Sequence, residues 1–443
     1  MHRRLPWLLS SVAALSLMGS GVLAASTCAV TLGQTVAYSC LGVTAQDALE
    51  PLPSLQDRGG PLILSDNPEA FTQDGAFYRD TVTGRFRVFL HHQNRTGSGQ
   101  EVGVALTNPG PSPEVILSLG AGTGTSVYPD VAGQSALAGF LATRYRTRPL
   151  ALLMPGQSVT EAVYTPPGET TSGFEDFSAV GVPSGVGPGP GRGPGLPPVP
   201  SLPSGLLRAA HPSPFLPNAR LVNHPPLPPG FTAAPVTVTT LAFSGPPPRD
   251  PASIAVEPPS IPLVIHGRGT FPADDRFGVI DLSTTRPIQW LAVDSAISGP
   301  YSRAMPGEYL TGYDAVDHTS VVDNGNYGVL YNFHVVVDNA AHVRAPYWVL
   351  LQPSGGFGHY VESFDGGVEV SPFLNYLHAW AFAETTLHPN RNRATLDTSL
   401  TGGSDGPQKL IFDGALPGPV GPSLPGPRGR VPAGPLAGGS GAP

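Results

Sequence analysis

The sequence predicts a mostly β protein, with two β-sandwich-like domains joined by a Pro/Gly-rich linker and followed by a disordered C-terminal tail. Three observations support this prediction. The 443 residues include 55 Gly and 53 Pro, which helix interiors tolerate poorly. Two long segments alternate apolar and polar residues, with turn residues between the runs, as short strands do. One Gly- and Pro-rich stretch separates these segments, and another follows them.

Residues 1–24 have the three parts of a secretory signal peptide: the positive charges of Arg3 and Arg4, an apolar core, and small residues that end at Ala24. We expect cleavage after Ala24. No transmembrane segment is expected after signal removal, because proline, serine and glycine interrupt the apolar core. The protein is therefore expected to be secreted or to lie in the cell envelope.

The next segment, residues 25–59, holds the only two cysteines of the chain, Cys28 and Cys40. In an exported protein such a pair favours a disulfide, which stabilises the fold by restricting the unfolded chain. Two weaker alternatives are lipid modification of Cys28 and a metal pair. Thr27 is large for a lipidation site, and no His or Cys partner lies nearby in the sequence.

Residues 60–180 are predicted to form the first β-sandwich-like domain. The stretch Arg85–His92 places Phe86, Val88 and Leu90 on one face of a strand, and a turn at Thr83 and Gly84 is expected to fold it back onto residues 76–80. Turn residues also separate two later pairs of predicted strands, 102–106 from 115–119 and 150–154 from 158–163. One segment, residues 130–143, has helical spacing instead.

The linker is assigned to residues 181–234, because residues 181–230 contain 15 Pro and 9 Gly. The second β-rich domain then spans residues 235–412, and the disordered tail spans 413–443. Within the second domain, residues 327–337 are the strongest predicted strand, and a turn at 338–339 leads to another at 342–351. Residues 371–380 fit either a helix or a strand pair.

Charge excludes one broad class of function. Without Arg3 and Arg4 the chain has 22 basic residues (24 minus 2) against 32 acidic ones, a balance of −10. Nucleic-acid binding needs a basic face that neutralises phosphates, so no nucleic acid is expected as a partner.

Motifs for common catalytic chemistry are absent from the sequence. There is no Gly-x-Ser-x-Gly elbow, no phosphate-binding Gly-rich loop with a following Lys, and no His-Glu-x-x-His. We therefore assign no catalytic residue and no cofactor except a candidate Ca²⁺. Its ligands would be the hard oxygens of Asp314, Asp317, Asp323 and Asn324. The alternative, which we favour, is that these residues build structural turns.

Two further interpretations concern carbohydrates. The same aspartates offer carboxylates for a glycosidase pair, which needs two acids about 5–10 Å apart. Trp290, Trp348 and Trp380 are candidates for a sugar-stacking platform, although core packing is the commoner role for aromatic residues on apolar strands.

Several segments resemble a group of secreted bacterial proteins of uncharacterised activity, some of which carry a copper-amine-oxidase-like N-terminal stalk domain. The segments are 62–69, 75–82, 87–94, 311–317, 324–331 and 400–411. We find no stalk here, so the resemblance implies no oxidase chemistry and transfers no catalytic residue. It does imply that residues 409–412 form the last core strand.

Together these features predict an exported, non-enzymatic protein of the cell envelope or extracellular space with a binding or structural role. Cell-wall or extracellular polysaccharide is the expected partner, and the structure is expected to have no deep polar pocket. The alternative is a secreted carbohydrate-active hydrolase or sugar-binding protein that uses carboxylates and aromatics of the second domain.

Overall fold

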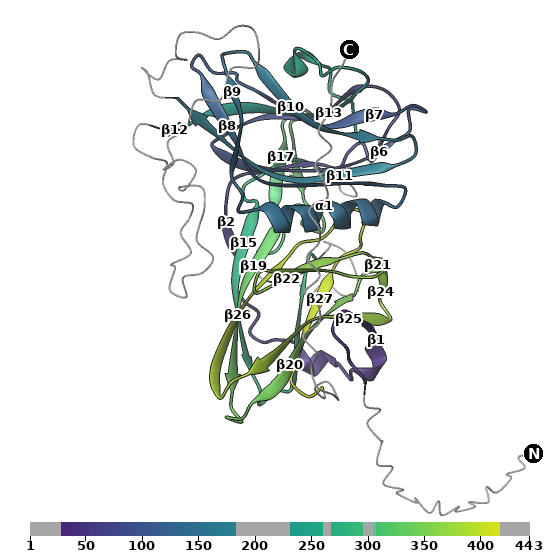
Figure 1. The fold of residues 1–443 in the computed structure, drawn as a ribbon, viewed down its shortest axis with the longest axis vertical. Helices are drawn as coiled ribbons and strands as arrows, with labels where there is room; N and C mark the ends of the chain where they lie inside the picture. The colour runs from purple at the N-terminus through teal and green to yellow at the C-terminus, as the bar shows by residue number, and fades with distance from the viewer. Residues whose placement is uncertain (1–27, 183–230, 260–266, 296–304, 306, 417–443) are drawn as a thin grey trace, which may run out of the picture.

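The computed structural model describes residues 28–182, 231–259, 267–295, 305 and 307–416. Within these ranges the chain is mostly β, as predicted, with four main sheets, a small two-stranded sheet and a single α-helix. The sheets pack in two pairs, which we call the upper and lower sandwich after their places in Figure 1. The predicted signal peptide, most of the predicted linker and most of the predicted tail lie outside the described residues.

The upper sandwich pairs a ten-stranded sheet with a four-stranded sheet. The ten-stranded sheet consists, in order, of β18 (Thr319–Val322), β17 (Thr311–Asp314), β14 (Arg268–Phe271), β3 (Leu62–Ser65), β6 (Arg85–Asn94), β11 (Thr170–Gly181), β8 (Glu114–Ser126) and β9 (Arg148–Leu153), with β4 (Ala70–Phe71) beside β6 and β12 (Thr232–Ala233) beside β11. The four-stranded sheet consists of β10 (Ser158–Thr165), β7 (Gln100–Thr107), β13 (Pro235–Phe243) and β5 (Gly75–Thr83).

The lower sandwich pairs a six-stranded sheet with a five-stranded sheet. The six-stranded sheet consists of β2 (Gln56–Arg58), β15 (Asp275–Ser283), β19 (Leu330–Asn339), β26 (Asn390–Thr398), β22 (Val361–Phe364) and β23 (Gly367–Val370). The five-stranded sheet consists of β1 (Thr35–Ala37), β25 (His378–Leu387), β20 (Ala345–Pro353), β27 (Gln408–Asp413) and β16 (Ile288–Val293). Strands β21 (Phe357–Gly358) and β24 (Leu374–Asn375) form a separate two-stranded sheet, and 3₁₀ turns occur at Tyr38–Cys40, Ala45–Asp47 and Pro251–Ser253.

Strand β6 shows how the alternating pattern is used. Phe86, Val88 and Leu90 lie in the upper core, on one face as predicted, while Phe89 on the other face packs into the lower cluster. This strand is central in its sheet, between β3 and β11, and is covered on both faces. Because both faces of β6 are covered, most of its polar residues are buried along with its apolar ones.

Strands that follow one another along the chain mostly cross between sheets. The predicted turn at Thr83 and Gly84 joins β5 to β6, but β5 pairs with β13 and β6 pairs with β3 and β11. The same holds for β7 and β8, for β9 and β10, and for β19 and β20. The predicted reversal at Thr83 and Gly84 is present, but residues 85–92 do not pair with residues 76–80, because this turn leads from one layer of the sandwich to the other.

The chain also crosses the predicted domain boundaries. Strand β13, at the start of the predicted second domain, completes the upper four-stranded sheet, and β14, β17 and β18 extend the upper ten-stranded sheet. Conversely, β1 and β2 from the amino-terminal segment pair with β25 and β15 in the lower sandwich. Each sandwich is therefore built from both halves of the sequence. Packing also continues past residue 412, since Asp413 and Leu416 are buried.

The disulfide Cys28–Cys40 is present, as predicted, and closes a loop that contains β1, which pairs with β25 of the lower sandwich. Residues 371–380, for which the sequence left two alternatives, form β24 and the start of β25 instead of a helix. The predicted helix over 130–143 is confirmed as α1 (Pro129–Thr143). No helix in the described parts of the chain has the length and apolarity needed to cross a bilayer.

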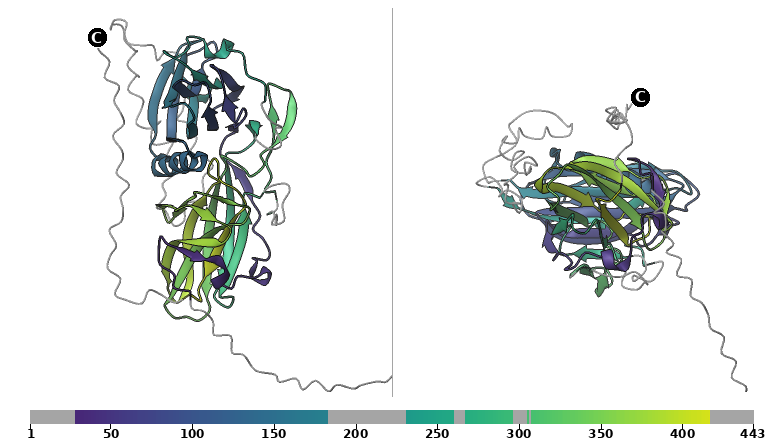
Figure 2. Two further views of the ribbon diagram at one scale, coloured as in Figure 1. Left: turned by 90° about the vertical axis from the view of Figure 1, so that its right-hand side faces the viewer. Right: turned by 90° about the horizontal axis from the view of Figure 1, so that it is seen from below.

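Helix α1 lies between the two sandwiches, against the ten-stranded sheet (Figures 1 and 2). Three alternate glycines of β8 permit its close approach: Gly120, Gly122 and Gly124. A Cβ on Gly122 would lie 1.9 Å from the carbonyl oxygen of Ala136, and one on Gly124 would lie 2.3 Å from that of Ala132. Any larger side chain on this face of β8 would separate the helix from the sheet.

Arginine–aspartate ion pairs and a histidine–aspartate contact connect the two sandwiches at their junction. Arg87 of β6 donates from Nε to Asp176 of β11 at 2.7 Å and from Nη2 to Asp275 of β15 at 3.0 Å. At the ends of α1, His359 Nδ1 lies 2.7 Å from Asp130 Oδ2, and Arg144 Nη2 lies 2.6 Å from Asp397 Oδ2. These contacts fix the relative position of the two sandwiches and therefore the shape of the cavity between them.

Candidate functional site

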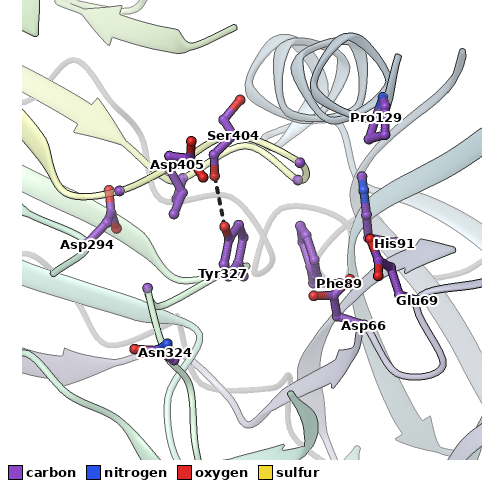
Figure 3. Close-up of a pocket in the computed structure, with 15 residues that line it drawn as sticks. Asp66, Glu69, Phe89, His91, Pro129, Asp294, Asn324, Tyr327, Ser404 and Asp405 are labelled. Carbon is purple, nitrogen blue, oxygen red and sulfur yellow. Dashed lines mark hydrogen bonds between the residues drawn. The ribbon is translucent and has the colours of Figure 1, made fainter. Parts of the chain in front are cut away.

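A cavity of about 410 Å³ lies at the junction of the two sandwiches, near the amino-terminal end of α1 (Figure 3). Its size lies within the range of small-ligand pockets, about 300–1,000 Å³. The expectation of no deep polar pocket stays a prediction, although polar and acidic residues line this cavity. The cavity is lined by Asp66, Glu69, Phe89, His91, Pro129, Asp294, Asn324, Gly325, Tyr327, Leu400, Gly402, Gly403, Ser404, Asp405 and Gly406.

The upper wall of the cavity comes from consecutive parts of the ten-stranded sheet. Asp66 and Glu69 follow β3, Phe89 and His91 lie on β6, and Pro129 begins α1. Because β3 and β6 are neighbouring parallel strands, the end of β3 brings its polar loop beside the last residues of β6.

The lower wall comes from three connecting segments, two of which run between the sandwiches. Asp294 follows β16, Asn324 and Tyr327 lie between β18 and β19, and residues 400–406 connect β26 to β27. Figure 3 shows these side chains facing those of the upper wall, with Tyr327 beside Phe89 in the middle. Residues separated by more than 300 positions in the sequence thus share one cavity.

Three rings form a row through the cavity. The ring centroids of Tyr327 and Phe89 are 6.0 Å apart, and those of Phe89 and His91 are 6.5 Å apart with the ring planes inclined by only 12°. Tyr327 is held in place by its hydroxyl, which donates to the carbonyl oxygen of Ser404 at 2.8 Å. Burial raises the pKa of Tyr327 well above its ordinary value, and nearby aspartates add to this, so the hydroxyl stays protonated and donates.

Asp294 is a fully buried acid of the lower wall. Its φ of 56° lies in the left-handed region, where few residues other than glycine and asparagine are found. Gln408 donates to Oδ2, whereas Oδ1 has no hydrogen-bond partner among the described residues. Burial raises the pKa of Asp294 well above the ordinary range, the hydrogen bond from Gln408 opposes this shift, and the neighbouring Glu308 and Asp323 add to it, so the protonated form of this carboxyl is favoured.

Asp323 is a second buried acid, immediately before Asn324 in the chain. Its Oδ1 accepts a hydrogen bond from the backbone amide of Tyr327 at 2.9 Å. Burial raises the pKa of Asp323 well above its ordinary value, and the charge of Asp66 also raises it. By contrast, Glu69 and Asp405 are exposed to solvent. The cavity therefore combines a buried acid of raised pKa with solvent-exposed carboxyl groups.

Glycines in the 400–406 connection allow it to lie against the upper wall. A Cβ on Gly402 would lie 2.4 Å from Nδ1 of His91, and one on Gly403, whose φ is 74°, would lie 2.7 Å from the backbone nitrogen of Asp130. A sequence signal for this part of the site was available, since three glycines and two hydroxyl residues occur within residues 400–406. The glycines indicated that the backbone packs closely against another segment, but not that this segment is the upper wall of the cavity.

The four residues of the candidate Ca²⁺ site do not come together as expected. Arg268 donates from Nε to Asp314 Oδ2 and from Nη2 to Asp317 Oδ2, each at 2.9 Å, on the upper ten-stranded sheet. Asp323 and Asn324 lie instead at the cavity. In the described ranges, no group of three or more His, Cys, Asp or Glu side chains is arranged to hold a metal ion. Asp314 and Asp317 therefore stabilise a buried guanidinium, and only Asn324 of the four lines the cavity.

The tryptophans do not form a stacking platform. Trp348 and Trp380 are buried in the lower sandwich, and Lys409 Nζ lies 4.3 Å from the ring centroid of Trp290. Core packing, the commoner role, is the one that the structure assigns to Trp348 and Trp380. The residues of the cavity were missed because they come from segments whose proximity depends on the crossing between sandwiches. Four of the segments that carry the family resemblance, 62–69, 87–94, 324–331 and 400–411, supply lining residues.

Comparison with known proteins gives little further information. No family model and no curated protein matches the sequence. Among solved structures, a multicopper oxidase from Campylobacter jejuni aligns with 72% of this chain at 8% identity, with a TM-score of 0.10. The aligned part of this chain spans about half (48%) of that protein. A likeness at this TM-score carries no argument about fold or chemistry.

Proposed function

We propose that this protein is an exported carbohydrate-binding protein whose ligand enters the cavity between the two sandwiches. The observation that carries the proposal is the cavity itself, which combines exposed carboxylates with a row of rings. Its presence favours a binding role over a purely structural one. The disulfide supports export, because disulfides persist in oxidising compartments.

The charge of the lining selects the class of ligand. Glu69 and Asp405 are exposed acids, Asp66 is a further acid, and none of the described lining residues is Lys or Arg. An anionic ligand would therefore be repelled. Ionised carboxylates only accept hydrogen bonds, so they suit a ligand rich in hydroxyl donors, and Asn324 can both donate and accept.

The aromatic rings and the volume of the cavity also support a hydroxyl-rich ligand. Sugars present C–H groups on one face and hydroxyls around the edge, which suits a pocket with aromatic side chains and a few polar groups. Tyr327 and His91 provide the rings at either end of the row. A cavity of about 410 Å³ is at the small end of the ligand-pocket range, so it suits one end of a saccharide and not an entire polymer.

Isothermal titration with neutral oligosaccharides tests this proposal, with a polyamine and a sulfated sugar as competing classes. We expect binding of a neutral oligosaccharide that Glu69→Gln and Asp405→Asn each weaken by about tenfold or more, because each removes a charged hydrogen-bond acceptor. The matched control is Asp365→Asn. Asp365 is an exposed acid that does not line this cavity, and its φ of 48° suits Asn. Binding of only the polyamine or only the sulfated sugar would contradict the proposal.

A hydrolase is the second candidate, favoured by one observation. Asp294 is a buried acid of raised pKa in the same cavity as the exposed Glu69 and Asp405, and glycosidases use one protonated and one ionised carboxyl group. Release of reducing sugar from a bound oligosaccharide, lost in Asp294→Asn while binding is retained, would establish this activity. Binding without release would leave the protein a binding protein.

A further inference from the structure

The exposed aromatic residues of the lower sandwich are not those that the sequence indicated. Phe357, Phe373, Tyr376 and Leu377 are 54%, 54%, 58% and 56% exposed, and all four lie in or beside the two-stranded sheet of β21 and β24. We call this group the aromatic ledge. Large apolar side chains clustered at the surface mark interaction sites more often than single ones do.

The ledge is held in a defined shape. Phe357 of β21 pairs with Asn375 of β24. Leu374, which follows Phe373 in the chain, is fully buried and anchors this two-stranded sheet. The ring centroids of Phe357 and Phe373 are 5.8 Å apart with the planes at 40°, and the ring of His359 lies 5.6 Å from that of Phe373. Such preorganised rings lose little conformational freedom when a ligand stacks on them.

Hydrogen bonds join the ledge directly to the cavity wall. The backbone amide of Phe357 donates to Asp405 Oδ2 at 3.1 Å, and the amide of Asp405 donates to the carbonyl oxygen of Phe357 at 3.0 Å. The amide of His359 also donates to Ser404 Oγ at 3.1 Å. Because Ser404 and Asp405 line the cavity, the ledge begins where the cavity wall ends. In Figure 1, β21 and β24 lie below one end of α1.

We propose that the aromatic ledge binds the continuing units of a polysaccharide chain whose terminal unit occupies the cavity. This inference rests on the proposed function and extends it from a short saccharide to a polymer. The ledge has no Lys or Arg between positions 354 and 377, and the exposed Asp365 and Glu369 lie nearby in sequence, so it does not suit an anionic membrane surface. Exposed rings with Asn375 and His359 between them suit a neutral, hydroxylated chain.

The test is the dependence of affinity on chain length. Glucose and N-acetylglucosamine oligomers, from the monomer to the hexamer, are titrated into the full-length mature protein and into Phe373→Ala. In the unaltered protein we expect affinity to increase with length. In Phe373→Ala we expect the hexamer to bind about three- to tenfold more weakly, with the monomer and dimer unchanged.

Two controls separate the ledge from the cavity. Tyr164→Ala removes an aromatic residue that is 59% exposed on β10 of the upper sandwich, and it should change no affinity. Glu69→Gln should weaken oligomers of every length. Thermal melting of each variant shows that it remains folded, as expected for residues with exposed side chains.

The outcomes distinguish the two proposals. If no oligomer binds, the proposed function fails. If short oligomers bind but affinity does not increase with length, or if Phe373→Ala weakens all lengths equally, the ledge proposal is overturned while the cavity proposal stands. Self-association in sedimentation that Phe373→Ala abolishes, or binding to phosphatidylcholine vesicles, would assign the ledge to a second copy or to a membrane and would also overturn it.

Discussion

Glu175 shows how the packing of the two sheets of a sandwich determines the pKa of a single residue. Glu175 lies on β11 opposite Val88, so it faces the interior of the upper sandwich. Burial, with a smaller contribution from Glu161 and against a lowering by Arg148, raises its pKa to about 8. From about pH 4.5 to about pH 8 the folded protein retains a proton that the unfolded chain releases. Stability therefore decreases as the pH increases through this window.

The variant Glu175→Gln tests this effect. We expect its free energy of unfolding, measured with urea between about pH 5 and about pH 8, to decline less steeply than that of the unaltered protein, by at most about 1.4 kcal/mol per pH unit. It should also be the more stable of the two at about pH 8. The control Asp281→Asn changes an acid that is 70% exposed and should leave the slope as it is. Equal slopes for Glu175→Gln and the unaltered protein would refute the assignment.

Arg87 is the residue on which the junction depends. Its guanidinium is 1% exposed and pairs with Asp176 and Asp275. Replacement by Met should lower the free energy of unfolding by about 3–5 kcal/mol, because it leaves buried carboxylates without their partner. The matched control is Arg391→Met, whose pair with Asp281 is 60% and 70% exposed and contributes at most about 1 kcal/mol. A similar decrease in the free energy of unfolding in the two variants would show that the buried Arg87 pairs stabilise the protein no more than an exposed pair does.

At the scale of elements, the contact between β8 and α1 depends on glycines rather than on large apolar side chains. Gly122→Ala should destabilise the protein by about 1–3 kcal/mol, since the added Cβ would collide with the helix backbone at Ala136. Thr123→Ala, on the exposed face of the same strand, should cost only a few tenths of a kcal/mol by the spread of strand propensities. Urea unfolding of both variants provides the measurement. A smaller loss for Gly122→Ala than for Thr123→Ala would mean that α1 can move away from the sheet.

Local patterns predicted individual elements better than their partners. The helix at 130–143 followed from its spacing, and the strand around Phe86, Val88 and Leu90 followed from alternation. Pairing did not follow, because a turn residue such as Gly84 reverses the chain equally well within one sheet or between two. Which of these occurs depends on which face of each strand is covered, and that is a property of the packed layers.

At the scale of the whole molecule, the two sandwiches are interleaved. The lower hydrophobic cluster includes Phe89, Phe140 and Phe174 from the upper sheet and α1, together with residues of both lower sheets. Chain segments also cross in both directions, as β13 and β1 do. Neither sandwich is a continuous stretch of sequence, so we expect one cooperative unit in place of two independent domains.

Expression of residues 235–412 alone tests this interleaving. We expect the fragment to lack a cooperative unfolding transition, because β13, β14, β17 and β18 would have no upper sheet to join and β15 and β25 would lose β2 and β1. Circular dichroism during heating, compared with residues 25–416, provides the measurement. A fragment that melts cooperatively at a temperature near that of the longer chain would show that the boundary at residue 235 separates independent domains after all.

The sequence alone determined the mostly β character, the single helix and the disulfide, because composition, periodicity and cysteine count act over short distances. Only the tertiary structure decided the strand partners, the burial of Trp348 and Trp380, and the pairing of Asp314 and Asp317 with Arg268. It also decided the candidate site. The cavity joins Asp66 to Asp405 through the packing of one sandwich on the other, and no local pattern records which distant loops that packing brings together.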